Sequence, residues 1–292
     1  DLEKIWDHIF INELRVKPNE HPILLTEPPK NPKVNREKMS QIMFETYNIP
    51  SLYIGIQGVL SIYTSGRTTG IVCECGDGVT QIIPIYEGYY FKHAIVRQNL
   101  GGHDITCYLQ KLLNEQGYYF TSSSEKEIVR DIKEKQSYVA LNYDAEIAHP
   151  IEKIKYVLPD NRNIILNEEV FNCTELLFNP FLNGFELKGI HNALFESIKT
   201  CDIDVRKDLY ANIILSGGSS MFQGFPERIE KEITNLAPPK IRNIFAIRYP
   251  EYKYGVWIGG SIFASFASFP EMSVSNEEYV ENGLQIIHNK FL

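Results

Sequence analysis

The stretch Glu74-Cys75-Gly76-Asp77-Gly78-Val79-Thr80 decides how the fold of this chain is interpreted. It separates two apolar runs, 69–73 and 81–86, and the pattern predicts two strands joined by a tight turn. Glycine adopts the positive φ that tight hairpin turns require, so an Asp-Gly pair in this position is a strong hairpin signal. A tip with so few side chains also leaves backbone N–H groups free to bind phosphate. An ordinary surface hairpin gives the same short pattern, and the motif alone does not separate the two.

A second glycine turn occurs far along the chain. Residues 211–215 have the pattern of a buried strand, and Ser216-Gly217-Gly218-Ser219-Ser220 separates them from a predicted helix over 226–236. A glycine pair lets a ligand approach the backbone, and the N–H groups of a following helix attract an anion. A plain turn with a serine cap is the alternative. With the charged helix predicted over 127–136 and the segment 252–261, the two turns indicate a nucleotide between two α/β halves.

Composition sets the broad class of protein. The chain has 292 residues, of which 43% are apolar and 23% charged, so we expect one large or two medium globular domains. The net charge of -8 argues against nucleic acid as a partner, because binding phosphate backbones needs a basic face. Five cysteines without a disulfide or zinc spacing are typical of reduced thiols in a cytosolic protein. No apolar run has the length of a membrane helix, so no membrane insertion is expected.

The periodicity of apolar residues predicts an α/β fold with mixed sheets. Strands and helices alternate along the chain, and hairpins at the glycine regions exclude purely parallel sheets. The apolar segment 254–269 is expected to form a packed core helix. Helices are predicted over 2–14, 35–46, 57–63, 105–112, 127–136, 190–198, 226–236 and 254–269, and strands over 23–25, 52–56, 138–141, 211–215 and 241–247.

Long stretches of the chain resemble actins. The resemblance runs over essentially the whole sequence and keeps the family's order. Its motifs are NELRV at 12–16, NREKM at 35–39, QIMFET at 41–46, SGRTTGIV at 65–72, PIYEGY at 84–89, RDIKEK at 130–135, RKDLYAN at 206–212 and VWIGGS at 256–261.

This resemblance implies a fold. Actins have two similar α/β halves of the actin, hexokinase and heat-shock chaperone type (RNase H-like), with mixed sheets around a nucleotide cleft. In this chain, residues 1–98 would form the first half, with 254–292 packing back on it, and residues 99–253 would form the second. The match starts inside the family's sequence, so the first half is expected to be incomplete.

The resemblance also implies a site for ATP with Mg²⁺ or Ca²⁺. The turn at 76–79 corresponds to a phosphate loop, 133–134 to residues beside the adenosine, 102 to a ribose-side glycine, and 218–222 with 253 to the base pocket. The residues assigned to the nucleotide are Gly76, Asp77, Gly78, Val79, Gly102, Lys133, Glu134, Gly218, Ser219, Met221, Phe222 and Lys253. Individually these residues have ordinary explanations, since a helical Lys-Glu pair is usually a surface ion pair.

Gln57 and Glu74 are the residues that the resemblance places in catalysis. Gln57 matches the glutamine that orients the attacking water, and an amide can do this without titrating. Glu74 replaces an aspartate beside the cation and is expected to bind that metal through water. Gln81 replaces a histidine near the attacking water, which removes a proton relay. These departures affect the expected hydrolysis rate more than the expected binding.

Two surfaces are expected to bind partners. Phe181, Leu182 and Phe185 match the hydrophobic plug of actin filaments, and exposing three large apolar side chains in a monomer is costly. They fold back on their own half in the alternative interpretation. A groove that takes amphipathic helices in actins is matched by Tyr63, Gly66, Thr68, Tyr89, Phe263 and Phe266, although either phenylalanine could be a core residue.

The function expected from the resemblance is that of an actin-like cytoskeletal protein of the cytoplasm. It would bind ATP with Mg²⁺, assemble with its own copies into filaments, hydrolyse ATP slowly and bind actin-binding proteins. The alternative is a non-polymerising actin-related subunit of a larger complex, with a structural nucleotide. A sugar kinase of the same superfold is disfavoured, because actin-like stretches have no reason to recur in one. The sequence does not select between ATP and GTP.

Overall fold

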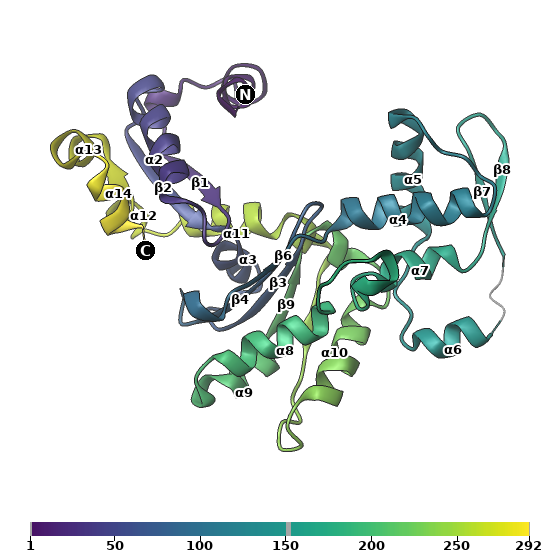
Figure 1. Ribbon diagram of the computed structural model, residues 1–292. Coiled ribbons are helices and arrows are strands. Elements are labelled where there is room, and N and C mark those ends of the chain that lie inside the picture. The colour runs from purple at the N-terminus through teal and green to yellow at the C-terminus, as the bar shows by residue number, and fades with distance from the viewer. Residues whose placement is uncertain (1, 150–152, 292) are drawn as a thin grey trace. The chain divides into compact units, whose positions relative to one another are not determined.

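The computed structural model describes residues 2–149 and 153–291 of this chain (Figure 1). It contains two compact units, one formed by Asp1–Thr64 with Val256–Leu292 and the other by Ser65–Gly255. The terminal residues 1 and 292 and the segment 150–152 belong to the predicted halves but lie outside the described residues. Both units contain strands and helices, and their sheets are mixed, which confirms the predicted α/β class.

The smaller unit is built on a three-stranded sheet with the order β1-β2-β11. Strands β1 (Ile23–Glu27) and β2 (Ser51–Ile56) are parallel, and β11 (Val274–Ser275) is antiparallel to β2. The apolar side chains of Met43, Ile49 and Leu52 are fully buried in its core. Its helices are α1 (Leu2–Asp7), α2 (Lys33–Gln41), α3 (Gln57–Thr64), α11 (Gly255–Ala264), α12 (Phe269–Met272), α13 (Asn276–Asn282) and α14 (Gln285–Lys290), with π-helical turns at His8–Leu14 and Ile42–Thr46.

Helix α11 corrects the prediction of one long core helix over 254–269. It ends at Ala264, and Trp257 on its surface is 75% exposed. The helix contacts α3 through small residues instead, since a Cβ on Gly259 would lie only 1.8 Å from the carbonyl oxygen of Leu60. The glycine face of α11 lets its backbone approach that of α3 closely, while the large side chain of Trp257 lies at the surface. The apolar composition of this segment therefore does not lead to complete burial.

The larger unit is built on a six-stranded mixed sheet with the order β10-β9-β3-β4-β5, and β6 also pairs with β4. Strands β3, β9 and β10 are parallel, whereas β4 is antiparallel to β3, so the predicted hairpin is confirmed. The strand predicted over 241–247 is reduced to two residues, and only an isolated bridge forms within 138–141. The strands are β3 (Gly70–Cys75), β4 (Thr80–Tyr86), β5 (Tyr89–Tyr90), β6 (Val96–Gln98), β9 (Ile213–Ser216) and β10 (Ala246–Ile247).

Helices surround this sheet and extend one end of the larger unit. Figure 1 shows α8 (Ile190–Thr200) and α10 (Phe225–Leu236) beside the sheet, while α4 (Gly102–Glu115) leads away from it toward α5 (Ser123–Gln136). Along β3, the side chains of Ile71, Cys73 and Cys75 join the main core of the unit. The remaining α-helices and strands described in this unit are α6 (Tyr143–Ala148), β7 (Ile154–Val157), β8 (Asn163–Leu166), α7 (Glu169–Glu175) and α9 (Ile203–Ala211).

The division between the units differs from the predicted halves. The larger unit begins at Ser65, whereas the prediction placed the division after residue 98. The physical reason is strand pairing. Strand β3 lies in register with β9, with Glu74 opposite Ser216, so the hairpin belongs to the same sheet as residues far along the chain.

A buried ion pair holds α7 and α10 together in the larger unit. The guanidinium of Arg228 donates two hydrogen bonds of 3.0 Å to the carboxylate of Glu175, and both side chains are buried. It also donates to Glu232 at 2.7 Å and to the carbonyl oxygen of Ala140 at 2.6 Å. Its carbon Cζ lies 4.6 Å from the centre of the Phe178 ring. Four of the five N–H groups of the guanidinium therefore donate hydrogen bonds within the unit.

Replacing Arg228 should make the larger unit less stable to unfolding. Arg228→Met leaves the Glu175 carboxylate buried without a partner, and we expect the free energy of unfolding to fall by about 3–5 kcal/mol. Urea denaturation measures the change. The double variant Arg228→Met/Glu175→Met removes both charges and should recover most of the loss. Equal losses in the single and double variants would contradict this account.

Candidate functional site

The tip of the β3–β4 hairpin presents free backbone amides. It is closed by a 3.0 Å hydrogen bond from the N–H of Gly76 to the carbonyl oxygen of Val79. Within residues 2–149 and 153–291, the N–H groups of Asp77, Gly78 and Val79 donate no hydrogen bond. A Cβ on Gly78 would meet no atom within 4 Å, so the space above the tip is open. Adjacent free amides with open space above them form a concave site for an anion.

The start of α4 packs directly against this tip. The N–H of Gly102 donates to the carbonyl oxygen of Gly76 at 3.0 Å, and the N–H of His103 donates to that of Asp77 at 2.8 Å. A Cβ on Gly101 would lie 2.3 Å from the Asp77 carbonyl oxygen. The contact is therefore between backbones, and glycine at position 101 is what allows it.

Two polar side chains from other segments complete the cluster. Lys133 of α5 donates from Nζ to the carbonyl oxygen of Gly102 at 2.9 Å, and Ser219 donates from Oγ to that of Gly76 at 2.9 Å. A Cβ on Gly102 would lie 2.7 Å from Ser219 Oγ, 3.2 Å from Asp77 Oδ1 and 3.3 Å from Lys133 Nζ. Burial lowers the pKa of Lys133, and the nearby Asp77 acts in the opposite direction. Four segments distant in sequence meet here.

The second glycine turn lies beside the first. Gly217 has a φ of +86°, its N–H donates to the carbonyl oxygen of Tyr252 at 3.1 Å, and a Cβ on it would lie 2.4 Å from the Cys75 carbonyl oxygen. The turn then continues as a 3-10 helix, Gly218–Met221. Helix α10 begins at Phe225, one residue before its predicted start, and this 3-10 helix precedes it; the binding of an anion at its first amides stays a prediction.

The segment predicted to form the floor of the base pocket is held by hydrogen bonds to its backbone. Arg248 donates from Nη1 to the carbonyl oxygens of Met221 and Phe222, both at 2.9 Å. The ring of Phe222 is buried in the main core, while Met221 is partly exposed. The backbone of this segment is therefore fixed, and Met221 is the side chain of the two that remains accessible.

Two charged residues assigned to the nucleotide lie at the surface. Glu134 is exposed and lies 3.9 Å from Arg130, which is the ordinary surface ion pair. Lys253 is also exposed, with Nζ 5.7 Å from the centre of the Tyr254 ring. Neither takes part in the cluster around Gly102, so their roles stay predictions.

Glu74 and Gln81 lie opposite each other on β3 and β4. Glu74 Oε2 and Gln81 Oε1 are both buried, and neither has a hydrogen-bond partner. Burial raises the pKa of Glu74 to about 7. The described residues contain no group of three His, Cys, Asp or Glu side chains that could hold a metal ion. One carboxylate and one amide oxygen instead suit a cation that keeps most of its waters and binds phosphate, as Mg²⁺ does.

Gln57 lies in the smaller unit, at the first residue of α3. It directly follows β2, so its place at a strand end agrees with the sequence. All the other residues assigned to nucleotide or metal belong to the larger unit. The role of Gln57 stays a prediction.

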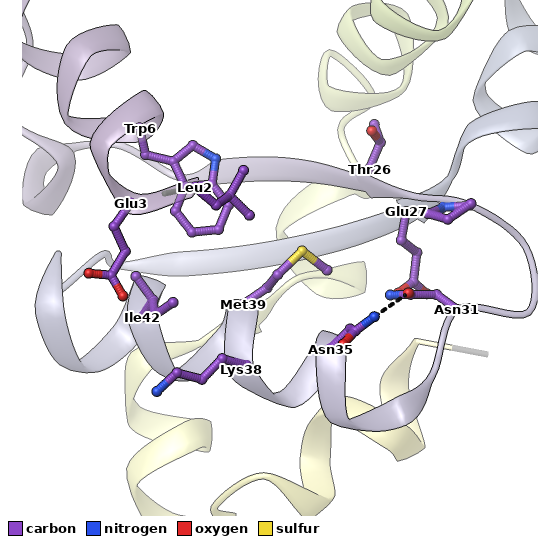
Figure 2. A pocket seen from close by; sticks show the side chains of 11 residues that line it. Leu2, Glu3, Trp6, Thr26, Glu27, Asn31, Asn35, Lys38, Met39 and Ile42 are labelled. Carbon is purple, nitrogen blue, oxygen red and sulfur yellow. Dashed lines mark hydrogen bonds between the residues drawn. The ribbon is translucent and has the colours of Figure 1, made fainter. Parts of the chain in front are cut away.

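A cavity of about 460 Å³ in the smaller unit involves none of the predicted nucleotide residues. Figure 2 shows Trp6 and Met39 at its apolar side and Glu27 with Asn31 at its polar side. The Glu27 carboxylate accepts hydrogen bonds from Arg36 and, at 2.9 Å, from Asn31. Its buried carboxylate is thus already paired.

The predicted groove residues fall in both units. In the smaller unit, Phe263 is buried, with its ring centre 5.7 Å from that of Tyr63, whereas Phe266 is exposed. Phe263 is thus a core residue. In the larger unit, Thr68 and Tyr89 are exposed, and Gly66 has a φ of +68°.

The predicted plug residues separate into two kinds. Leu182 and Phe185 pack against the main core of the larger unit. Phe181, within the 3-10 turn Pro180–Asn183, is 67% exposed. The alternative that part of this loop folds back is therefore correct for two of the three.

Sequence reasoning missed residues that support the site through the backbone. Gly101, Gly217 and Arg248 each contact carbonyl groups of the site segments. The glycine pairs 101–102 and 217–218 were visible in the sequence, but which glycine of each pair makes the close approach depends on how the segments meet. Nothing in the sequence singled out Arg248.

A family model for actin matches residues 1–292, the whole length of the chain. This match agrees with the motifs, the mixed α/β fold and the glycine-rich site. The chain belongs to the actin family. None of the described helices is both long and apolar enough to cross a membrane.

The buried carboxylate of Glu74 predicts a dependence of stability on pH. Burial raises its pKa from 4.5 to about 7, so the folded state prefers the protonated form. The contribution of Glu74 to stability should therefore be complete below about pH 4.5 and be lost as pH rises through 7, a change of up to about 3 kcal/mol. Urea unfolding between pH 5 and 8, with a chelator present, measures this decrease. Glu74→Gln should flatten the curve, and identical curves for both proteins would refute the assignment.

Proposed function

We propose that this chain binds ATP with Mg²⁺ at the cluster formed by the hairpin tip and the start of α4. The observation that carries the proposal is the convergence of polar side chains around Gly102. Polar atoms of Asp77, Lys133 and Ser219 lie so close to this residue that there is no room for a side chain on it. The free amides of 77–79 and the open space above Gly78 support phosphate binding there. Membership of the actin family supports the same class of ligand.

The residues would divide the work as follows. The amides at the tip would hold phosphate oxygens, and Lys133, bonded to the ribose-side glycine Gly102, would lie beside the adenosine. Glu74 and Gln81 would accept hydrogen bonds from waters around the cation. The cation itself neutralises charge on the phosphates. The resemblance gives Gln57 the role of orienting the attacking water, and an amide can perform it without titrating.

We further propose that copies of this chain assemble, with Phe181 as a contact. An exposed phenylalanine beside two packed apolar neighbours presents an apolar surface that a second copy could cover. The cytoskeletal function expected from the sequence rests on such assembly. The alternative is a subunit of a larger complex that keeps its nucleotide without polymerising, and the departures Glu74 and Gln81 favour it.

Glycine variants test the nucleotide site. A Cβ on Gly78 or Gly218 meets no atom within 4 Å, so Gly78→Ala and Gly218→Ala should fold normally. The same methyl groups would intrude on the bound nucleotide, at a phosphate for Gly78 and at the base for Gly218, and we expect ATP affinity to fall by about tenfold, or 1.4 kcal/mol. A fluorescent ATP analogue measures binding. Gly260→Ala is the matched control, since its Cβ would meet only ordinary contacts at 3.5 Å in the smaller unit. Unchanged affinity in both site variants would sink the proposed location.

A surface variant tests assembly. Phe181→Asp places a charge on the exposed apolar position, and we expect it to abolish salt-induced and Mg²⁺-induced pelleting while ATP binding is retained. Tyr119, which is 75% exposed, offers a matched control as Tyr119→Asp, and that variant should still pellet. If the native chain binds ATP but stays in the supernatant at every Mg²⁺ concentration, the complex-subunit function is the correct one.

A further inference from the structure

One row of side chains crosses four strands of the larger sheet. Glu74 of β3 lies opposite Ser216 of β9 on one side and Gln81 of β4 on the other, and Gln81 lies opposite Arg97 of β6. Residues directly opposite each other across a sheet point to the same face, so all four side chains share one face. Three strands thus bring a hydroxyl, a carboxylate and an amide side by side.

The neighbouring row on the same face is entirely apolar. This row contains Val72 of β3, which lies opposite Ile214 of β9 on one side and Ile83 of β4 on the other. Each of the three lies two residues along its strand from the member of the polar row on that strand. All three are completely buried. The polar row therefore marks an abrupt change in chemistry at the end of the sheet that carries both glycine turns.

Two members of the polar row, Ser216 and Arg97, have either a hydrogen-bond partner in the protein or access to solvent. Ser216 donates from Oγ to the carbonyl oxygen of Tyr252 at 3.2 Å, and Arg97 is exposed. Glu74 Oε2 and Gln81 Oε1 are the buried oxygens of this row that lack a partner. Gln81 is only 3% exposed, so bulk water does not readily reach it. When Glu74 is ionised, both oxygens are acceptors, and a bound species can supply the donors that they lack.

We infer that Gln81 is a cation-positioning residue, whose side-chain oxygen accepts a hydrogen bond from the same hydrated divalent cation as the carboxylate of Glu74. The inference rests on the proposed function and adds a residue to it. Water bound to Mg²⁺ is a strong donor, and Mg²⁺ retains several waters in protein sites. One hydrated cation would supply donors to both oxygens.

Two substitutions of Gln81 separate this role from a structural one. Gln81→Leu keeps the approximate size and removes the acceptor, and Gln81→Glu keeps an acceptor at the same length. We expect Gln81→Leu to raise the Mg²⁺ concentration needed for half-maximal ATP-dependent thermal stabilisation by about 10- to 100-fold, in the range of outer-shell mutations. Gln81→Glu should bind Mg²⁺ at least as tightly as the native chain. Electron paramagnetic resonance of free Mn²⁺ gives an independent count of bound cation.

The melting temperature without nucleotide or cation provides the second readout. Gln81→Leu removes a buried acceptor that has no partner, so it should melt at the same or a higher temperature than the native chain. A lower melting temperature would show that Gln81 pairs within the protein and would overturn the inference. An unchanged Mg²⁺ midpoint in a native-like Gln81→Leu protein would also overturn it while leaving the ATP site intact. Absence of ATP binding by the native chain would instead refute the proposed function itself.

Discussion

The contact between the hairpin tip and the start of α4 is the constraint on which the site depends. Two backbones meet at a distance that allows no side chain, since a Cβ on Gly101 would lie 2.3 Å from the carbonyl oxygen of Asp77. This contact fixes the direction of α4, and α4 in turn presents the Gly102 carbonyl to Lys133 of α5. A side chain at position 101 would separate the tip from the helices that carry its polar neighbours.

The parallel pairing of β3 with β9 explains why both glycine turns lie together. Parallel strands end on the same side of a sheet, and the carboxyl end of β3 leads into Gly76 just as that of β9 leads into Gly217. Ligand sites in α/β proteins usually lie beyond the carboxyl ends of parallel strands. The site therefore follows from register, and the two turns, although some 140 residues apart, share one edge.

Local patterns predicted the parts of the structure that depend on neighbouring residues. The hairpin, the strand before Gly217 and the helix that carries Lys133 lie in the structure close to the positions predicted from the apolar periodicity and the glycines. The sequence did not reveal that Gly101 makes the closest backbone approach or that Trp257 points outward, because both depend on which segments meet in space. The division between units was missed for the same reason. A strand at 70–75 can join either half until its partner is known.

Glu27 and Glu74 both have buried carboxylate oxygens, but their environments differ. Glu27 is 1% exposed and accepts hydrogen bonds from Arg36 and Asn31, so its burial serves the structure of the smaller unit. Glu74 has a buried oxygen with no partner, and burial raises its pKa to about 7. The carboxylate of Glu27 is thus paired within the protein, whereas Glu74 Oε2 has no partner and lies on the residue opposite Gln81, whose Oε1 also has none. Folded proteins tolerate such local conflicts mainly where a ligand resolves them, which is the physical reason for placing the cation at Glu74 and Gln81.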